Sequence, residues 1–553
     1  MDVVLVGLPG SGKSAIGRRL AHRHAAEFID LDERIESSTG RSIPEIFEAD
    51  GESAFRALER AAIAELGPVD PDPTIRRVIA TGGGAVVDPR NRWMLYRGRR
   101  TIWLDGRPEV LAQRLRRSPN VRPLVAGRDP IGTIRDLGTR RARFYAAAEL
   151  HQSGIPEVQG VVDTLEQRLV DGSTRQDSAG TTLLRAETPI GRLVIGVGIA
   201  ADALSAELET LAARRAVIVS EPGAWAAAGP AIEAGLRERG WGIELVLLPE
   251  GEAAKQLSVV ETAASRLATL RVERSEPLVA VGGGALGDTA GFLAATYLRG
   301  VPVIQVPTTL VAQLDSSIGG KTGVDLPEGK NLVGAFHQPA AIVSDVELLR
   351  TLPERQLRAA LGEAVKMAAL GDERLFELLE ADGPLIARGH PAAFGHGALA
   401  EVVERCAWAK VEVVVADERE RRPGGGRITL NLGHSLGHAV EAAAGFGDLL
   451  HGEAVAYGLR AASRIGLEVG VTPPDRAARI AALLDRLGLG IEPLPYSLET
   501  VLGHLATDKK HAATQLRWVL PTDEGVVVRD DVLAEVVERA ATSLLAAGAR
   551  SPT

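Results

Sequence analysis

The sequence is poor in cysteine, with Cys406 as the one thiol in 553 residues. A single cysteine excludes an intramolecular disulfide and suits a reducing compartment, so we expect Cys406 to be a small buried core residue. The sequence also lacks an apolar run long enough to cross a bilayer. Its first strand pattern begins so early that no room is left for a signal peptide. These absences predict a soluble, cytoplasmic protein without a membrane partner.

An excess of positive charge is missing as well. The formal net charge is −9, which argues against a nucleic-acid-binding surface. The guanine-recognition signature N-K-x-D and solenoid repeats are both absent from the sequence, which disfavours a GTPase and a repeat protein. The chain has 553 residues, of which 45% are hydrophobic, so we expect it to form more than one globular domain, and three in all.

The most informative motif is the glycine-rich segment 7–14, GLPGSGKS. It follows the apolar run 3–6, which predicts a buried strand, and precedes a helix pattern at 15–20. This is the context of a P-loop, whose glycines let backbone N–H groups converge on a polyphosphate at a helix N-terminus. Lys13 can reach the β- and γ-phosphates, and the Ser14 hydroxyl can ligate Mg²⁺. The predicted contacts to ATP and Mg²⁺ are Gly10, Ser11, Gly12, Lys13 and Ser14.

Acidic and arginine-containing segments follow this loop in a fixed order. Asp30 and Asp32 end a second strand-like run, where carboxylates can hold Mg²⁺ through water and hydrogen-bond a substrate hydroxyl. Further segments are GESAFR at 51–56, TGGGA at 81–85, NVRPL at 120–124 and the arginine pair 140–141. The stretch around 120–124 is rich in arginine and punctuated by Pro and Gly, which suits a mobile lid.

Together these motifs resemble shikimate kinase over residues 1–165. The resemblance implies transfer of the ATP γ-phosphoryl group to shikimate. Asp32 would bind the ring hydroxyls, and Arg56 and Arg141 would face the carboxylate, which suits the planar guanidinium. Arg122 would be a lid arginine that contacts ATP and stabilises charge on the transferred group. The implied shikimate contacts are Asp32, Arg56, Gly83, Gly84 and Arg141.

The pattern changes after residue 165. Residues 171–180 are polar and lack hydrophobic periodicity, so we expect a linker at 166–182. A new alternation of strands and helices begins near residue 182, with buried strands at 216–219 and 278–281. From about residue 346 the sequence is rich in Ala, Leu, Glu and Arg and predicts helices.

A second group of chemical motifs begins with the glycine turn VGGGALGD at 281–288. A glycine turn after a strand indicates phosphate contact by backbone amides. Candidate metal ligands follow at Glu363, His434, His438 and His451. His434 and His438 are one helical turn apart, so their spacing alone would allow both to bind one ion. One carboxylate and two imidazoles with an open position form a common catalytic zinc arrangement.

Residues 183–545 resemble 3-dehydroquinate synthase, a family of sugar-phosphate cyclases that use NAD⁺ and a divalent metal. The resemblance implies conversion of 3-deoxy-D-arabino-heptulosonate 7-phosphate to 3-dehydroquinate with release of phosphate. It implies Glu363, His434 and His451 as ligands of Zn²⁺ or Co²⁺, and leaves His438 to bind substrate or handle protons. The implied substrate and catalytic residues are Asp315, Lys321, Arg299, Asn331, Lys366, Lys410, Arg427, Asn431, His438 and Lys509 or Lys510.

The implied NAD⁺ contacts come from several segments of the same region. They are Glu252, Lys255, Gly283, Gly284, Asp288, Thr308, Thr309, Lys321, Lys330, Thr351, Leu352 and Gln356. Glu221 could bind the ribose hydroxyls, although the loop after the strand 216–219 departs from the family pattern.

The sequence thus predicts an α/β protein with four segments. They are a P-loop kinase with a parallel sheet flanked by helices at 1–165, a linker at 166–182, an α/β NAD-binding domain at 183–345 and a mostly α-helical metal-binding domain at 346–553. For the second half, a polyol dehydrogenase and a cyclase of another sugar phosphate stay open as alternatives, and either half could be an inactive interaction module. We expect small-molecule substrates and a homodimer formed through the synthase half.

Overall fold

The computed structural model describes most of the chain as two compact units. One unit is Met1–Glu187 with Leu193–Asp202, and the other is Thr188–Arg192 with Ala203–Thr553. The described residues are 1–69, 74–117, 129–154, 158–171, 180–395, 397–420, 422, 425–445, 447–490, 492–512 and 516–546. Among the helices of these ranges, none is both long enough and apolar enough to cross a membrane.

The first unit is built on a five-stranded sheet of order β2-β3-β1-β4-β5, in which every pairing is parallel. Its strands are β1 (Asp2–Val6), β2 (Glu27–Asp30), β3 (Arg77–Ala80), β4 (Arg100–Asp105) and β5 (Leu150–Ser153). The central strand β1 is buried along its whole length, which explains its continuous run of apolar residues. Because the strands are parallel, the loops after β1, β2 and β3 open at one edge of the sheet.

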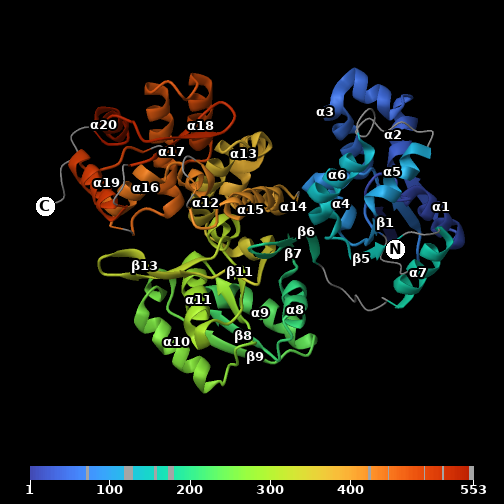
Figure 1. The fold of residues 1–553 in the computed structure, drawn as a ribbon, viewed down its shortest axis with the longest axis horizontal. Coiled ribbons are helices and arrows are strands. Elements are labelled where there is room, and N and C mark those ends of the chain that lie inside the picture. The colour runs from blue at the N-terminus through green and yellow to red at the C-terminus, as the bar shows by residue number, and fades with distance from the viewer. Residues whose placement is uncertain are drawn as a thin grey trace. The chain divides into compact units, whose positions relative to one another are not determined.

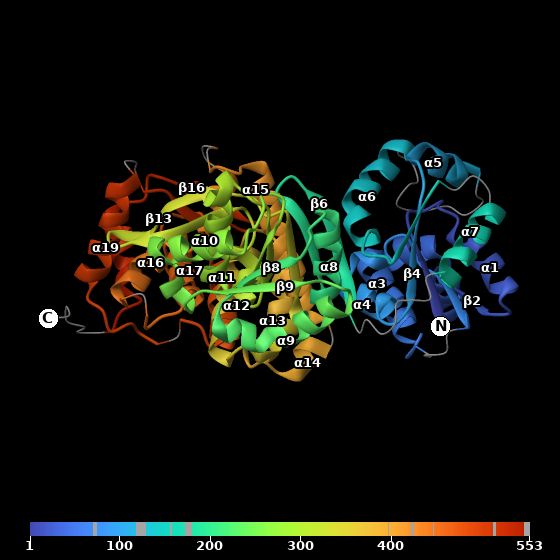
Figure 2. The ribbon, with the colours of Figure 1, turned by 90° about the horizontal axis from the view of Figure 1, so that it is seen from below.

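Helices cover both faces of this sheet. They are α1 (Lys13–Arg23), α2 (Leu31–Thr39), α3 (Ile43–Ala64), α4 (Pro89–Tyr96), α5 (Pro108–Arg117), α6 (Pro130–Tyr145) and α7 (Val158–Asp171). In Figures 1 and 2, α1 and α7 lie on one side of the sheet, and α4 and α6 lie on the other. Leu20 of α1 and Leu165 of α7 share one core cluster with Leu5 of β1. The sequence therefore predicted this layered fold correctly.

The end of α7 differs from the expected end of the kinase unit at residue 165. The helix continues to Asp171, because Leu165 and Leu169 are four residues apart and prolong its apolar stripe. The predicted linker 166–182 therefore begins inside a helix. Residues 172–179 of that linker lie outside the described residues.

The next sheet has seven strands in the order β6-β7-β14-β11-β10-β8-β9. They are β6 (Thr181–Thr188), β7 (Gly191–Val197), β8 (Ala216–Ser220), β9 (Ile243–Leu247), β10 (Leu278–Gly282), β11 (Val303–Pro307) and β14 (Ala341–Asp345). The strands from β9 to β14 in this order pair in parallel. After β8 the chain adds β9 on one side and then β10 on the other, so a switch point lies between β8 and β10.

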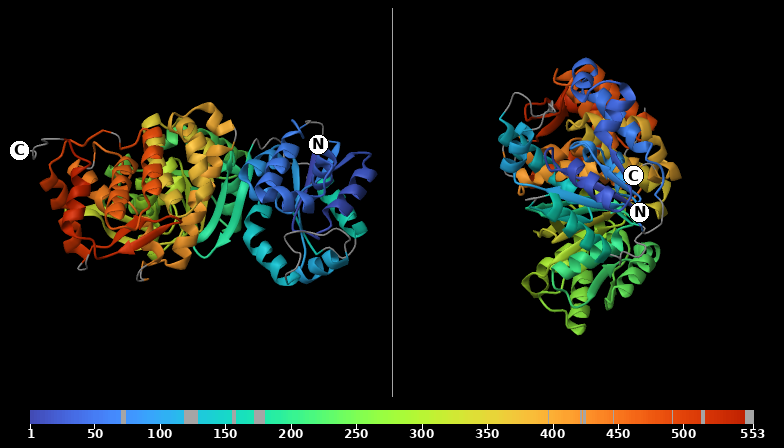
Figure 3. Two further views of the ribbon diagram at one scale, coloured as in Figure 1. Left: turned by 90° about the horizontal axis from the view of Figure 1, so that it is seen from above. Right: turned by 90° about the vertical axis from the view of Figure 1, so that its right-hand side faces the viewer.

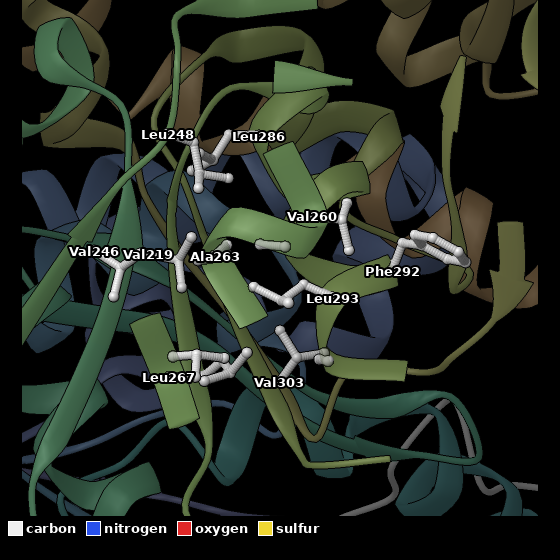
Figure 4. Packing of buried hydrophobic residues seen from close by; sticks show 14 of the residues in the cluster. Val219, Val246, Leu248, Val260, Ala263, Leu267, Leu286, Phe292, Leu293 and Val303 are labelled. Carbon is white, nitrogen blue, oxygen red and sulfur yellow. The ribbon is translucent and has the colours of Figure 1, made fainter. Parts of the chain in front are cut away.

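Helices α8 (Ala200–Thr210), α9 (Pro222–Glu238), α10 (Leu257–Thr269) and α11 (Gly284–Thr296) accompany this sheet. Figure 4 shows the core beneath α10 and α11, where Leu267 and Leu293 lie near Val219 of β8 and Val303 of β11. The antiparallel hairpin β12 (Lys321–Leu326) and β13 (Gly329–Phe336) follows β11 and packs against α11.

The remaining chain is mainly helical, as the sequence predicted. It contains α12 (Glu354–Ala369), α13 (Glu373–Ala387), α14 (Pro391–Gly395), α15 (Ala398–Ala416), α16 (His434–Ala443), α17 (His451–Glu468), α18 (Pro474–Arg486), α19 (Leu498–Ala512) and α20 (Ala534–Thr542), with one hairpin of β15 (Trp518–Pro521) and β16 (Val526–Arg529). Figure 3 shows the helices of this region from two further sides, coloured from gold to red. Cys406 is fully buried in α15, as expected.

Candidate active sites

The loop between β1 and α1 has the geometry of a phosphate cradle. Gly10 and Gly12 adopt φ angles of +82° and +88°, which favour glycine. The Lys13 side chain is buried and folds back over the loop, where its Nζ donates to the carbonyl oxygens of Gly7 (2.8 Å) and Leu8 (3.1 Å). The helix begins at Lys13, so its free N–H groups face the loop. The predicted strand, loop and helix context is confirmed.

An oxygen-rich pair lies beside this loop. The Ser14 hydroxyl donates to Asp30 Oδ2 at 2.6 Å, and Asp30 Oδ1 accepts the backbone N–H of Asp32 at 3.1 Å. Burial raises the pKa of Asp30, although the hydrogen bond from Ser14 opposes that shift. Hydroxyl and carboxylate oxygens suit Mg²⁺. The sequence shows Asp30 only as one of two neighbouring acidic residues. Its contact with Ser14 could not be predicted, because the two residues belong to different secondary-structure elements.

Three charged side chains converge on the glycine segment 82–84 after β3. A Cβ added to its first glycine would lie 2.8 Å from Asp32 Oδ1, and one added to its third glycine would lie 2.5 Å from Arg56 Nη2. The carbonyl oxygen of its middle glycine accepts from Arg141 Nη1 at 2.7 Å. Helices α2, α3 and α6 thus bring Asp32, Arg56 and Arg141 to the same segment, where two guanidinium groups can face one anionic ligand.

Glu59 is a member of this cluster that the motif pattern does not single out. It lies three residues after Arg56 on α3, is 1% exposed, and accepts from Arg56 Nη1 at 2.8 Å through Oε2. Within the part of the chain that the structure describes, its Oε1 has no hydrogen-bond partner. Burial raises the pKa of Glu59, and the Arg56 charge opposes that shift. The i, i+3 spacing from Arg56 is the sequence signal that could have found it.

A glycine turn and two hydroxyls form a second cradle, at the switch point between β8 and β10. A Cβ on Gly283 would lie 3.2 Å from Thr309 Cγ2, and a Cβ on Gly284 would lie 2.7 Å from Ser316 Oγ. The hydroxyl oxygens of Thr309 and Ser316 are both buried, and neither has a hydrogen-bond partner among the described residues. Glu221 follows β8 and accepts the N–H of Gly283 at 3.5 Å. Hydroxyl groups that are available for hydrogen bonding, next to a glycine turn at a helix N-terminus, suit the binding of a dinucleotide phosphate.

Lys255 connects this cradle to the β12–β13 hairpin. Its buried Nζ donates to Asp288 Oδ2 at 2.8 Å and also to the side-chain oxygen of Asn331. Burial alone would lower the pKa of Lys255, but the neighbouring Asp288 raises it. On the same strand as Asn331, Lys330 forms ion pairs with Glu252 (3.3 Å) and with Glu441. The predicted NAD⁺ and substrate residues of these segments therefore lie in one network.

A buried basic group lies between the π-helical turn Ala312–Ser316 and helices α12 and α15. Lys410 Nζ is 2.9 Å and Lys366 Nζ is 3.7 Å from Asp315 Oδ1. Burial alone would raise the pKa of Asp315, but Lys410 and Lys366 lower it. Arg427 lies next to this group and donates to the carbonyl oxygen of Gly319 at 3.2 Å. These three basic residues, far apart in sequence, thus form one buried basic cluster around Asp315.

Glu420 is a second residue that the sequence patterns do not single out. Its carboxylate accepts from Lys321 Nζ at 3.2 Å and from Asn431 Nδ2 at 3.1 Å. The glutamate thus joins β12 to the turn before α16 and lies between two predicted substrate residues. The contact could not be read from the sequence, because Lys321 and Glu420 are 99 residues apart.

The candidate metal ligands meet at the first turns of α16 and α17. Nε2 of His451 and Nε2 of His434 lie 3.1 Å and 3.4 Å from the same atom, Glu363 Oε1. His438 is exposed, and its ring centroid is 5.2 Å from that of His434 and 5.8 Å from that of His451. One nitrogen from each of the three histidines lies within 4.8 Å of the others. The structure therefore brings together Glu363, His434 and His451, the ligands that the resemblance implies. It also brings His438 close to His434, the pair that helical spacing alone would allow to bind one ion.

The charges in this cluster are strongly perturbed. Burial alone would raise the pKa of Glu363, but Lys366 and His434 hold it well below its usual range. Burial alone would lower the pKa of His451, but hydrogen bonds to Glu363 and Glu441 raise it to about 10. An anionic carboxylate thus faces a protonated imidazole, and a cation can take the place of that proton.

Two glycine contacts set the positions of these ligands. A Cβ on Gly452 would lie 1.9 Å from the carbonyl oxygen of Ala359, and a Cβ on Gly362 would lie 2.2 Å from the carbonyl oxygen of Gly452. These two glycines are adjacent to His451 and Glu363. Backbone contact between α12 and α17 therefore fixes the separation of two candidate ligands.

We expect Gly452→Ala to destabilise the second unit by about 1–3 kcal/mol, because a methyl group cannot enter this backbone contact without moving a helix. Thermal unfolding measures the loss, and Zn²⁺ titration should show weaker binding as His451 moves. Gly503→Ala is the control, since no atom of the described residues lies within 4 Å of a Cβ on that α19 glycine. Equal stability of the two variants would contradict this account of the helix contact.

Some predicted residues are not joined to these clusters. Arg299 is exposed, has a φ of +65° and takes part in none of the ion pairs among the described residues. Thr351 and Gln356 flank the start of α12, and their side chains form no hydrogen bond within the described ranges. Arg122 lies outside the described residues, and the side chains of Lys509 and Lys510 are likewise not described.

Three family models match separate parts of the chain. The shikimate kinase model matches residues 9–167. The models for the N-terminal and C-terminal parts of 3-dehydroquinate synthase match residues 245–359 and 360–511. The glycine loop after β1 thus lies in the part that matches a kinase, and the glycine turn at 281–288 lies in the part that matches a synthase.

Individual relatives agree with the second assignment. A 3-dehydroquinate synthase of Synechococcus sp. (strain CC9605) is 43% identical over 350 residues, which cover 63% of this chain and 90% of that protein. The structure of ValA, a 2-epi-5-epi-valiolone synthase from Streptomyces hygroscopicus subsp. jinggangensis with NAD⁺ and Zn²⁺ bound, is 30% identical with a TM-score of 0.55, covering 61% of this chain and 92% of that one. A 2-deoxy-scyllo-inosose synthase complexed with carbaglucose-6-phosphate, NAD⁺ and Co²⁺ is 25% identical with a TM-score of 0.57, covering 64% and 97%.

Proposed function

Since the chain belongs to the 3-dehydroquinate synthase family and carries a shikimate kinase domain ahead of the synthase part, we propose specific roles for the residues of its two sites. The two domains make it a bifunctional enzyme of the shikimate pathway, both a phosphotransferase and a phosphate-eliminating lyase. The observation that carries the proposal is the meeting of Glu363, His434 and His451 beside a buried pair of lysines.

In the kinase domain the loop 7–14 would hold the phosphates of ATP. Lys13 is already directed at the loop, and it can exchange its carbonyl partners for phosphate oxygens. Ser14 and Asp30 would hold Mg²⁺, directly and through water. Asp32 would accept a hydrogen bond from the shikimate hydroxyl that is phosphorylated, and it can take up the proton released there.

Two arginines should separate binding from catalysis in the kinase. We expect Arg56→Ala to raise the KM for shikimate about tenfold or more with a modest change in kcat, because a carboxylate clamp contributes mainly ground-state binding. Arg122→Ala should mainly lower kcat, since a lid arginine acts on developing phosphoryl charge. Steady-state kinetics measure both, with Arg34→Ala on α2 as control. An exchange of the two patterns would refute the assignment.

In the synthase part the donor set fits a divalent metal. Glu363, His434 and His451 offer one carboxylate oxygen and two imidazole nitrogens, which suit Zn²⁺ and also Co²⁺. When bound, the metal would supply Lewis acidity to a substrate hydroxyl. His438 stands beside this set and would hold a substrate oxygen or pass a proton. The unpartnered Thr309 and Ser316 hydroxyls beside the glycine turn fit NAD⁺, which would supply reversible hydride transfer.

The basic cluster would bind the two anionic ends of the heptulosonate phosphate. Lys366, Lys410 and Arg427 are held in fixed positions by hydrogen bonds and ion pairs, so they need little rearrangement to stabilise charge. Such a cluster of basic side chains favours a cyclase over a polyol dehydrogenase, whose substrate has no phosphate. Lys321 and Glu420 would meet the substrate from the hairpin side.

A substrate panel on the full chain tests the function. ATP consumption and phosphate release should be measured separately with shikimate, the heptulosonate phosphate and a simple polyol. We expect ATP use only with shikimate, and phosphate release without net NADH only with the heptulosonate phosphate. Net NADH formation from the polyol would instead support a dehydrogenase.

We further propose a homodimer that forms through the synthase part and works in the cytoplasm, where ATP and NAD⁺ are both supplied. Light scattering of the full chain and of residues 180–553 measures the first point, since both should give dimers. The NAD⁺ domain would comprise residues 183–345 and the metal domain 346–553.

A further inference from the structure

Glu441 lies behind the candidate metal ligands rather than among them. It is on α16, its side chain is 11% exposed, and its Oε2 is 3.1 Å from Nδ1 of His451. The other ring nitrogen, Nε2, faces Glu363 Oε1 at 3.1 Å. The imidazole is therefore held between two carboxylates, one on the ligand side and one on the opposite side.

This arrangement decides which nitrogen of His451 is available. When a cation displaces the proton on Nε2, the hydrogen bond from Nδ1–H to Glu441 keeps Nδ1 protonated, so the lone pair on Nε2, the atom directed at Glu363, is left for the metal. His434 is held in the same way, because its Nδ1 lies 3.1 Å from the carbonyl oxygen of Leu432. Both imidazoles thus direct Nε2 toward Glu363 Oε1. The orientation of His434 is fixed by a backbone carbonyl, whereas that of His451 is fixed by the side chain of Glu441.

The other oxygen of Glu441 is also engaged. Oε1 lies 3.4 Å from Lys330 Nζ, and Lys330 in turn is 3.3 Å from Glu252. Lys330 belongs to β13, so a chain of contacts runs from the hairpin through Glu441 to His451. The lysine limits the rotation of the carboxylate that the imidazole needs.

We propose that Glu441 is a positioning residue: it fixes the tautomer and the ring orientation of His451 so that Nε2 binds the divalent metal, with Lys330 holding Glu441 in place. The inference rests on the proposed metal site. It predicts that loss of Glu441 weakens metal binding even though Glu441 is not a ligand. A purely structural ion pair with Lys330 would leave the metal affinity unchanged.

The test measures Zn²⁺ affinity of the metal-depleted full chain by competition with a chromophoric chelator. We expect Glu441→Ala to weaken Zn²⁺ binding about 10–100-fold. Glu441→Gln should lose less, because its amide oxygen can still accept the Nδ1–H hydrogen bond. Glu468→Ala, which removes an ion-paired carboxylate at the far end of α17, serves as control and should bind like the wild type.

Co²⁺ absorption in the visible range gives a second readout, since reorienting His451 changes the ligand field. The spectrum should change in Glu441→Ala and be restored in Glu441→Gln. If the alanine variant fails to fold, Lys330→Met still decides, because loss of the lysine that holds Glu441 should weaken Zn²⁺ binding several-fold. Wild-type affinity in a folded Glu441→Ala protein would overturn the inference. Absence of Zn²⁺ binding by the wild type would overturn the metal site itself, and so the two failures are distinguishable.

Discussion

Lys13→Ala should lower shikimate phosphorylation by about 10³-fold or more and leave phosphate release from the heptulosonate phosphate unchanged. The lysine charge is needed where negative charge gathers on the transferred phosphoryl group, and no other residue of the loop 7–14 carries a positive side chain. The synthase activity should persist because its residues belong to the other sheet and the helices after it. Coupled assays of ADP and phosphate on one preparation measure both activities.

Arg18→Ala is the matched control for this variant. Arg18 lies on the same helix as Lys13, but its side chain is 54% exposed and pairs with Glu33 at the surface. We expect the kinase and synthase activities of Arg18→Ala to stay near those of the wild type. If a folded Lys13→Ala protein lost both reactions equally, the two sites would not be independent.

His434→Ala and His451→Ala should each lose bound metal and synthase activity together. Removal of one of the three protein ligands weakens metal binding. Loss of the metal's Lewis acidity should raise the activation free energy by several kcal/mol, which lowers the rate about 10³-fold. His438→Ala should lose activity but keep the metal, because it is expected to contact substrate. Atomic emission on the folded variants gives the metal content, and phosphate release gives the activity.

Kinase activity is the internal control for these three variants. A chelator should reproduce the effect of His434→Ala in the wild type, and added Zn²⁺ or Co²⁺ should reverse it, while the kinase needs only Mg²⁺. The geometry alone would also permit His438 as a ligand, since the three imidazoles lie together. A metal-free His438→Ala protein and a fully loaded His451→Ala protein would replace the proposed ligand set with that alternative.

The parts of the fold that sequence predicts well are those in which neighbouring residues carry the information. The strand β1, the loop 7–14 and α1 are contiguous, so glycine spacing and an apolar run define them together. The same holds for β10 and the glycine turn at 281–288. The end of α7 was less predictable, because its apolar stripe fades into a polar segment without a stop signal.

The contacts missed by sequence are those that tertiary packing creates. Glu420 contacts Lys321 and Glu441 contacts Lys330 across 99 and 111 residues of chain. Glu441 contacts His451 only 10 residues away, but the two residues lie on different helices. Acidic residues on helices are common, and no local pattern distinguishes these two from solvated ones. Glu59 is different: its spacing from Arg56 was visible, but its burial depends on how α3 packs.

The three candidate ligands come from α12, α16 and α17, and 88 residues separate Glu363 from His451. An ion at this point would act as a crosslink that only the folded chain can form. By mass action, free metal at 100 times its Kd would add about 2.7 kcal/mol to the stability of the synthase half. The thermal stability of that half would then rise and fall with the concentration of free metal.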